Sequence, residues 1–363
     1  MAFMFRRNVR ICGVAAGVPK RIVSNLDLSA EAGEISADYT PEAYVELTGV
    51  KERRVSPTLC TSDLCFAATE CLLRDIKWDK STIDGILFVS QTRDYVLPAT
   101  ACILQDKLGL SKECYAADIS LGCSGWVYGL SIAASLIDKE NLKRVLLLVG
   151  DAKKICEQCI DPLFGFAGTA TALEYCEDAE GFQFHFGTDG SGYEAIIVPD
   201  CGSRNQIKRT SLDLEVYEGR SIHRLQARMK GMDVFSFGIT TAPKSVKKLA
   251  EHFGLDYLSY DYFLFHQANM KMNSIIAKKL KLEPEKVPSE MYNFGNTSSA
   301  SIPLLMVTQI RDQINNQKKK FICCGFGVGL SWGTVAFEQA IPVSPLVEVE
   351  DSEANYGYRL PEA

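Results

Sequence analysis

The 363-residue chain lacks the features of a membrane-spanning or exported protein. It has no run of about 18 uncharged apolar residues, the length that crosses a bilayer as a helix. Arginines occur near its start, but no long apolar segment follows them, so no signal peptide is expected. We therefore expect a cytoplasmic protein that makes no contact with a membrane.

An excess of basic residues is also absent. Lysine and arginine number 39 against 45 acidic residues, which gives a formal net charge of −6. Nucleic-acid binding needs clustered positive charge, so no nucleic-acid partner is expected. Metal ligands are sparse too: there are four histidines, and the pair Cys156 and Cys159, which has redox or metal spacing, has no second pair or histidine nearby. We expect no metal and no other cofactor.

Cysteine, by contrast, is plentiful. The chain has 13 cysteines, an odd number, and most of them lie inside apolar runs. This usage is typical of reduced thiols in a cytosolic protein rather than of a disulfide framework.

The length of the chain allows two domains, or one large domain made of two halves.

Short apolar runs alternate with helical patterns in the first half of the chain. Strands are predicted at Ile86–Ser90, Cys114–Ile119 and Val145–Val149, with an apolar helix at Ser124–Ile137. This alternation indicates an α/β protein whose sheet has helices on both faces.

The second half repeats the style of the first. The predicted helices are Pro243–Phe253, Gln267–Leu280 and Ser298–Ile314, and the predicted strands are Tyr262–Phe265, Phe321–Cys324 and Thr334–Phe337. The polar segment Cys201–Arg228 is interpreted as a loop excursion over a binding site. The acidic segment from Ile341 onward is expected to be a poorly ordered extension.

Cys123 is the most informative residue. It lies between Gly122 and Gly125, where a predicted strand turns into a helix. The N–H groups at a helix N-terminus favour a thiolate over a thiol, as in a nucleophile elbow. The alternative is a buried structural cysteine.

Two further residues are candidates for chemistry. His266 is the one histidine at a predicted strand-to-helix junction, where functional side chains of α/β folds gather, although it could equally be a structural histidine. Asn296, in Gly-Asn-Thr-Ser, could simply cap a helix. The glycine-rich run Gly325–Gly333 has no following lysine, which excludes a Walker loop; its N–H groups could instead form an oxyanion hole.

These four segments, in this order, make the chain resemble the β-ketoacyl-acyl carrier protein synthase III family of the thiolase superfamily. The resemblance covers about residues 8 to 338. Further matching segments are Thr48–Arg54, Leu97–Ala99 with Cys102, Thr188–Ser191 and Ala277–Leu280.

The resemblance implies a five-layered αβαβα fold built from two similar halves, and a homodimer. The halves are expected at residues 1–180 and 181–340, followed by an acidic tail at 341–363. It also implies a catalytic triad of Cys123, His266 and Asn296, and an oxyanion hole formed by the N–H groups of Cys123 and Gly329.

The implied reaction is a decarboxylating condensation. Cys123 takes the acyl group from an acyl thioester of coenzyme A or acyl carrier protein, and malonyl-acyl carrier protein then loses carbon dioxide. The enolate is held by neutral donors, Nε2 of His266 and the amide of Asn296. Alternatives are an acyltransferase that passes the acyl group to an alcohol or amine, and a non-catalytic partner subunit.

Other positions are assigned only through the resemblance. Lys271, Lys278 and Lys279 share one helix face and match the helix that docks acyl carrier protein, although a lysine-rich helix face is usually only solvated. Leu97 matches the position that crosses the dimer interface into the partner's acyl pocket, where family members often carry a bulky aromatic residue.

The chain departs from the family at several places. The tryptophan that clamps coenzyme A falls near Ala43 and Tyr44, an arginine contact falls at Leu47, and the segment from Cys159 to Phe164 looks shortened. Phe166 replaces an aspartate. These differences favour a carrier-protein donor and a specialised fatty-acid or polyketide-type pathway. The related hydroxymethylglutaryl synthases need a glutamate that Val89–Arg93 lacks, and thiolases often use a second cysteine in place of Asn296.

Overall fold

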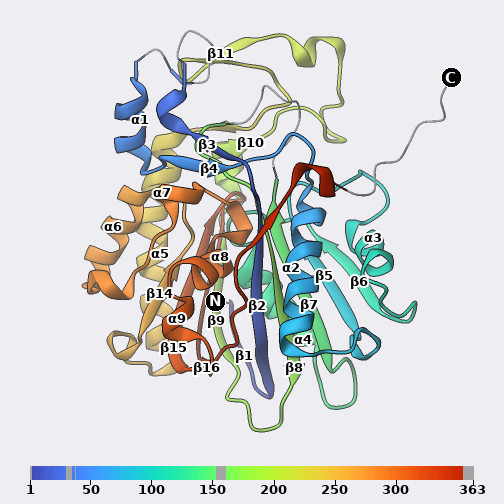
Figure 1. The fold of residues 1–363 in the computed structure, drawn as a ribbon. Coiled ribbons are helices and arrows are strands. Elements are labelled where there is room, and N and C mark those ends of the chain that lie inside the picture. Colours follow the sequence, from blue (N-terminus) through green and yellow to red (C-terminus); the bar gives the residue numbers. More distant parts are fainter. Residues whose placement is uncertain (1, 30–34, 37, 153–160, 355–363) are drawn as a thin grey trace, which may run out of the picture.

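A computed structural model describes residues 2–29, 35–36, 38–152 and 161–354. Two large sheets lie face to face with helices between and outside them (Figure 1). The six-stranded sheet has the order β17 (Val347–Val349), β2 (Val9–Pro19), β8 (Ala167–Tyr175), β7 (Arg144–Asp151), β5 (Gly85–Val89) and β6 (Tyr115–Ile119). The five-stranded sheet has the order β1 (Ala2–Arg6), β9 (Phe182–Thr188), β16 (Ser331–Ala340), β15 (Lys318–Gly327) and β14 (Tyr262–Phe265).

Helices form three layers around the two sheets. On the outer face of the six-stranded sheet lie α2 (Thr61–Ile76) and α3 (Thr100–Lys107). Between the sheets lie α4 (Gly125–Leu136) and α8 (Ser301–Thr308), each in contact with both sheets. Outside the five-stranded sheet lies α5 (Gly231–Phe253), with α6 (Met270–Leu280) packed on it. The predicted five-layered α/β fold is confirmed.

The central layer explains why the segment that became α4 is apolar nearly all round. Trp126, Val127 and Leu130 are buried in one cluster with side chains from both sheets, such as Val89 and Phe184. A helix between two sheets has no solvent face, so it carries no polar stripe.

Shorter elements connect these layers. Helices α1 (Pro41–Thr48), α7 (Met291–Phe294) and α9 (Arg311–Ile314) lie in connections, as do two-stranded ribbons. The ribbons are β3 (Ile22–Ser24) with β4 (Glu52–Arg54), β10 (Ile196–Ile197) with β13 (Arg228–Met229), and β11 (Glu215–Tyr217) with β12 (Arg220–Ile222). No helix in the described ranges is long and apolar enough to cross a membrane.

Two predicted helices have different bounds in the structure. The helix predicted at Ser298–Ile314 is divided into the 3-10 turn Ser298–Ala300, α8 and α9, because Ile310 leaves helical geometry (φ −128°, ψ 12°) while its side chain stays buried. Helix α5 begins well before Pro243, which is an interior residue. Phe235 and Phe237 in its first turns pack against the apolar cluster that α5 and α6 form with the outer face of the five-stranded sheet. This packing extends the helix.

The C-terminal segment is not a poorly ordered extension as far as residue 354. Strand β17 pairs in parallel with the end of β2, with Val349 opposite Pro19. Val349 is buried in one cluster with Phe166 and Leu64, and Glu348 pairs with Arg54 at 2.7 Å. Burial of alternate valines and pairing of the acidic residues hold this segment in place, which the acidic composition did not suggest.

The predicted boundary between halves at residues 180 and 181 stays a prediction. The two sheets do not follow this boundary strictly, because β1, from the start of the chain, belongs to the five-stranded sheet, and β17, from its last part, belongs to the six-stranded sheet.

The cluster that contains Phe166 also accounts for the phenylalanine at the position of the family's aspartate, because this side chain packs among apolar side chains there.

Candidate active site

Cys123 lies between the end of β6 and the first turn of α4, as the sequence predicts. The N–H of Gly125 donates to the carbonyl of Gly122 at 2.6 Å and closes the turn that presents Cys123. A Cβ at Gly122 would lie 2.3 Å from Oε1 of Gln91 and 2.8 Å from Cγ1 of Val328, so a side chain there would force both neighbours to move. The thiol therefore lies at the N-terminus of a 12-residue helix, where the helix dipole favours negative charge.

The end of β15 lies directly against Cys123. A Cβ at Gly327 would lie 2.7 Å from Sγ and 2.6 Å from Cβ of Cys123. At Gly329, which has a φ of 142°, a Cβ would instead meet Ser331. Of these two glycines, Gly327 is thus the one that lies against the sulfur of Cys123. The role of Gly329 in an oxyanion hole stays a prediction.

His266 directly follows β14. Its N–H donates to the carbonyl of Cys324 at 2.9 Å and its ring is buried. Nδ1 lies 2.9 Å from Oγ of Ser301, and the edge of the ring meets Phe326 at 5.7 Å between centroids. Contacts with α8 and with β15 therefore fix the imidazole.

Asn296 is held by its backbone and its side chain. Its N–H donates to Leu163 at 2.9 Å, and its carbonyl accepts from Gly165 at 3.2 Å. Its Oδ1 accepts the N–H of Ser298 at 2.8 Å. Because the amide oxygen is bound in this way, the amide orientation is fixed and the Nδ2 hydrogens are directed to other acceptors.

The structure brings these three segments together. The start of α4 meets the segment after Asn296, because a Cβ at Gly125 would lie 3.2 Å from Cβ of Ser299. Ser124 is hydrogen bonded to Ser331 at 2.7 Å. His266 reaches the same region through Ser301. A thiol, an imidazole and an oriented amide thus come from segments around both central helices.

Sequence reasoning missed Asp151, a buried carboxylate beneath this cluster. Its Oδ1 accepts from Ser90 Oγ at 3.0 Å and from the N–H of Gln91 at 2.8 Å, and its Oδ2 lies 3.4 Å from Ser299 Oγ. Asp151 thereby connects the turn at Gln91, which contacts Gly122, to the segment after Asn296. The available signal was an acid at the end of an apolar strand.

A second missed residue is Glu290. It is fully buried near Thr308, with its N–H 3.3 Å from Oε1 of Gln267. Burial raises the pKa of Glu290 well above its usual 4.5, and the hydrogen bond that Thr308 donates opposes part of this effect. Glu290 thus lies beside Gln267, which follows His266 in the chain, and beside Thr308 of α8.

The residues predicted to meet a carrier protein are all exposed. Lys271, Lys278 and Lys279 lie on α6, and Nζ of Lys279 donates to the carbonyl of Ile239 on α5 at 2.9 Å. Leu97 lies between β5 and α3 and is 83% exposed.

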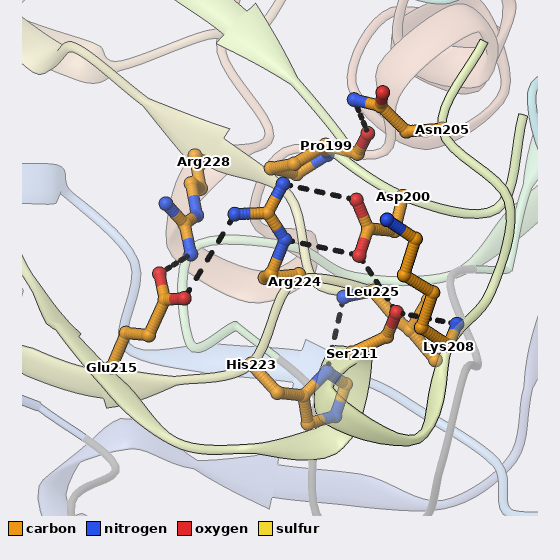
Figure 2. A network of polar contacts seen from close by, with 10 residues as sticks. All are labelled: Pro199, Asp200, Asn205, Lys208, Ser211, Glu215, His223, Arg224, Leu225 and Arg228. Atoms are coloured by element: carbon orange, nitrogen blue, oxygen red, sulfur yellow. Dashed lines mark hydrogen bonds and ion pairs between the residues drawn. The ribbon is translucent and has the colours of Figure 1, made fainter.

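The polar excursion contains its own hydrogen-bonded network (Figure 2). Asp200 accepts from Arg224 at 3.0 and 3.1 Å and from Ser211 at 2.7 Å. Glu215 pairs with both Arg224 and Arg228. Hydrogen bonds from Arg224 and then Ser211 lower the pKa of Asp200. These contacts give the excursion a defined shape around a polar cavity of about 360 Å³, whose lining includes none of the three predicted catalytic residues.

Part of the region predicted to contact coenzyme A is described. Tyr44 lies on α1 and burial raises its pKa. Leu47 is exposed, and its carbonyl accepts from Asn269 at the start of α6. The pair Cys156 and Cys159 lies outside the described residues. Among the residues that are described, no group of three or more histidine, cysteine or acidic side chains is placed to hold a metal ion.

A cysteine at a central helix, a histidine after a strand and an oriented asparagine, within five layers, define a condensing enzyme of the thiolase superfamily. Two family models match the chain: 3-oxoacyl-[acyl-carrier-protein (ACP)] synthase III at residues 117–190, and the C-terminal domain of the same family at 250–339. The chain belongs to the β-ketoacyl-acyl carrier protein synthase III family, whose members are acyl-transferring enzymes.

Individual relatives match over nearly the whole chain. The β-ketoacyl-[acyl-carrier-protein] synthase III of Desulfitobacterium hafniense (strain Y51) is 30% identical over 90% of this chain and 96% of its own length. That of Lactococcus lactis subsp. lactis (strain IL1403) is 31% identical over 90% and 97%. The crystal structure of 3-oxoacyl-(acyl-carrier protein) synthase from Burkholderia xenovorans LB400 has a TM-score of 0.86 and 38% identity, covering 96% of this chain and 99% of that one.

Glu290 predicts a pH effect on stability. Because folding raises its pKa, the native state keeps a proton that the unfolded chain loses above about pH 4.5, so this group lowers stability as pH rises. Glu290→Gln stays neutral at every pH. We expect its Tm to equal that of wild type near about pH 5 and to exceed it by a few degrees near about pH 8 in scanning calorimetry. The exposed Glu285→Gln is the control, and parallel Tm curves for wild type and Glu290→Gln would contradict the assignment.

Proposed function

We propose that the chain catalyses a decarboxylating condensation between an acyl group carried on Cys123 and malonyl-acyl carrier protein. The observation that carries this proposal is the orientation of Asn296. Its Oδ1 is bound to the N–H of Ser298, which leaves the Nδ2 hydrogens free for another acceptor; an enolate needs such neutral donors and simple acyl transfer does not.

The first step is acyl transfer to the enzyme. The thiolate of Cys123, stabilised at the N-terminus of α4, attacks the thioester carbonyl of the acyl donor. A bond forms between Sγ and the acyl carbon, and the bond to the donor sulfur breaks. The donor leaves as a thiolate and is protonated to a thiol.

The oxyanion of this step needs backbone donors. We assign these to the N–H of Cys123 and to the turn after β15, where the family resemblance indicates Gly329. Support comes from the contact of this strand end with the sulfur, since Gly327 leaves no side chain between β15 and Cys123.

The second step is decarboxylation and condensation. The malonyl group loses carbon dioxide as the electron pair of that C–C bond passes into a thioester enolate, held by Nδ2 of Asn296 and Nε2 of His266. The enolate carbon then attacks the acyl group on Cys123. A C–C bond forms, the C–S bond breaks, and the β-ketoacyl thioester leaves with the carrier protein.

Variants at two residues separate the two steps. Cys123→Ala is expected to form no acyl adduct with any acyl-coenzyme A or acyl-carrier-protein donor in intact-protein mass spectrometry. Asn296→Ala is expected to form the adduct at nearly the wild-type rate but to clear it with malonyl-carrier protein about 10²–10³-fold more slowly.

Other outcomes of the same experiment would identify different functions. A wild-type adduct that persists with malonyl-carrier protein but clears with an alcohol or amine identifies an acyltransferase. The absence of an adduct from every donor points to a non-catalytic partner subunit.

We propose that α6 docks the acyl carrier protein through Lys271, Lys278 and Lys279. The three ammonium groups are exposed on one helix that begins four residues after His266. A positive surface on a chain of net charge −6 attracts an acidic carrier selectively to this side of the molecule.

Lys278→Glu tests this surface. We expect it to raise KM for malonyl-carrier protein about tenfold with little change in kcat, since it weakens encounter rather than chemistry. KM for the small substrate malonyl-pantetheine should stay unchanged. Lys143→Glu, the same charge change at an exposed position next to β7, is the control. Equal KM increases for both malonyl substrates would show that the effect is not on docking.

A homodimer is proposed from an open sheet edge next to an exposed apolar loop. Strand β6 is the last strand of its sheet. Nearby, Val96 is 72% and Leu97 83% exposed, between β5 and α3. An open edge and exposed apolar side chains are liabilities unless another chain covers them. A second copy of the chain would cover both the edge of β6 and the exposed loop, and it would bring Leu97 of one protomer towards the acyl pocket of the other.

Sedimentation tests this assembly. Wild type is expected at twice its 40.1 kDa mass, and the double variant Val96→Arg with Leu97→Arg should weaken dimerisation at least about tenfold by burying two charges. Leu258→Arg, on the far side near β14, should leave the dimer intact. A monomeric wild type at micromolar concentration would overturn the proposal.

The pathway is proposed to be a specialised fatty-acid or polyketide-type one. Phe166 in place of the family's aspartate and Tyr44 near the place of the tryptophan support this, as does Leu97 in place of a bulky aromatic residue. A cytoplasmic location is proposed as well, because none of the eleven cysteines among the described residues forms a disulfide bond.

A further inference from the structure

The hydrogen bonds around His266 define which of its ring nitrogens carries the proton. Oγ of Ser301 lies 2.9 Å from Nδ1 of His266 and 2.9 Å from the carbonyl oxygen of Ser298. All three residues are about 1% exposed, so water does not compete for these contacts.

A serine hydroxyl has a single proton, and a carbonyl oxygen can only accept one. The contact with Ser298 therefore uses the proton of Ser301. The contact between Ser301 and Nδ1 is then a hydrogen bond only if Nδ1 donates. The opposite arrangement would leave two oxygen lone pairs facing each other at 2.9 Å in a buried site, which is unfavourable.

We infer that Ser301 is a positioning residue that holds neutral His266 in the Nδ1–H tautomer, so that Nε2 is a proton acceptor in the resting enzyme. This differs from the neutral Nε2 donor expected from the family resemblance. The carbonyl of Ser298 fixes the hydroxyl, the hydroxyl fixes the ring, and the lone pair of Nε2 is left for the reacting groups.

The tautomer gives His266 a defined place in the proposed reaction, on which this part of the inference rests. Nε2 takes the thiol proton of Cys123 and produces a thiolate and an imidazolium. After the thiolate has accepted the acyl group, the departing donor thiolate takes up the one proton that the overall condensation consumes, and this proton comes from the bulk solvent. His266 then donates from Nε2 as a cation to the enolate, and condensation returns Cys123 as a thiolate beside it.

The same peptide unit also orients the second donor. The N–H of Ser298 binds Oδ1 of Asn296, while its carbonyl accepts from Ser301. One residue, with a φ of 54°, therefore sets both the amide orientation of Asn296 and the proton position on His266.

Nitrogen NMR of the wild-type protein tests the tautomer directly. With ¹⁵N-labelled histidine, Nδ1 and Nε2 of a neutral ring have distinct shifts according to which one is protonated. The His266 signals are assigned by their loss in His266→Gln. We expect neutral His266 to be protonated at Nδ1; protonation at Nε2 would overturn the inference. This result does not depend on catalysis, so it is separable from failure of the proposed function.

Ser301→Ala provides the functional test, and the chain offers a matched control. Ser245 is equally buried and lies 2.8 Å from Nδ1 of His185, away from the candidate site. In Ser301→Ala we expect a mixture of His266 tautomers and about tenfold slower formation of the acyl-enzyme. Ser301→Thr, which keeps the hydroxyl, should restore the Nδ1–H form.

The outcomes separate positioning from general destabilisation. Ser245→Ala should leave the His266 signals and the acylation rate unchanged even if its Tm falls. If Ser301→Ala keeps a single Nδ1–H tautomer, or if Ser245→Ala slows acylation as much, Ser301 has only a structural role.

Discussion

The left-handed backbone of Ser298 is the constraint on which the candidate site depends. A non-glycine residue in this conformation costs about 1–2 kcal/mol, so the surrounding contacts must hold it there. Those contacts are the hydrogen bonds to Asn296 and from Ser301. If Ser298 relaxed to a right-handed turn, its N–H and carbonyl would point elsewhere, and the amide and the imidazole would lose their orientation together. Geometry at two functional groups is thus stored in one backbone torsion.

The buried central layer gives this turn a rigid base. Helices α4 and α8 have sheets on both sides, and the residues that lead into them are Cys123 and the segment from Asn296 to Ala300. Side chains on such elements are positioned more accurately than side chains on surface loops. Asp151 connects the segments that lead into α4 and α8, because it binds both the turn at Gln91 and the side chain of Ser299. The candidate site therefore lies at the ends of core elements.

Much of this arrangement could be predicted from local sequence. Cys123 and His266 each follow an apolar run and precede a helix, so their places at strand ends can be read from neighbouring residues. The contacts of Ser301, Asp151 and Glu290 could not, because their partners are distant in the chain: Ser301 binds His266 across 35 residues, and Asp151 binds Ser299 across 148. The C-terminal strand was missed for the same reason, since Val349 is buried only by its contacts with residues such as Phe166 and Leu64.

That strand also has a consequence for how the protein is made. Among the strands that the structure describes, β17 is synthesised last, although its partner β2 is among the first. Until residues 347–349 emerge, the end of β2 from Gly17 to Pro19 lacks its partner on that side, and Leu64 and Phe166 lack one of the side chains that cover them. Open edges beside apolar surface are where nascent chains join one another. Strand β17 thus closes this edge of the six-stranded sheet only after the other described strands have been made.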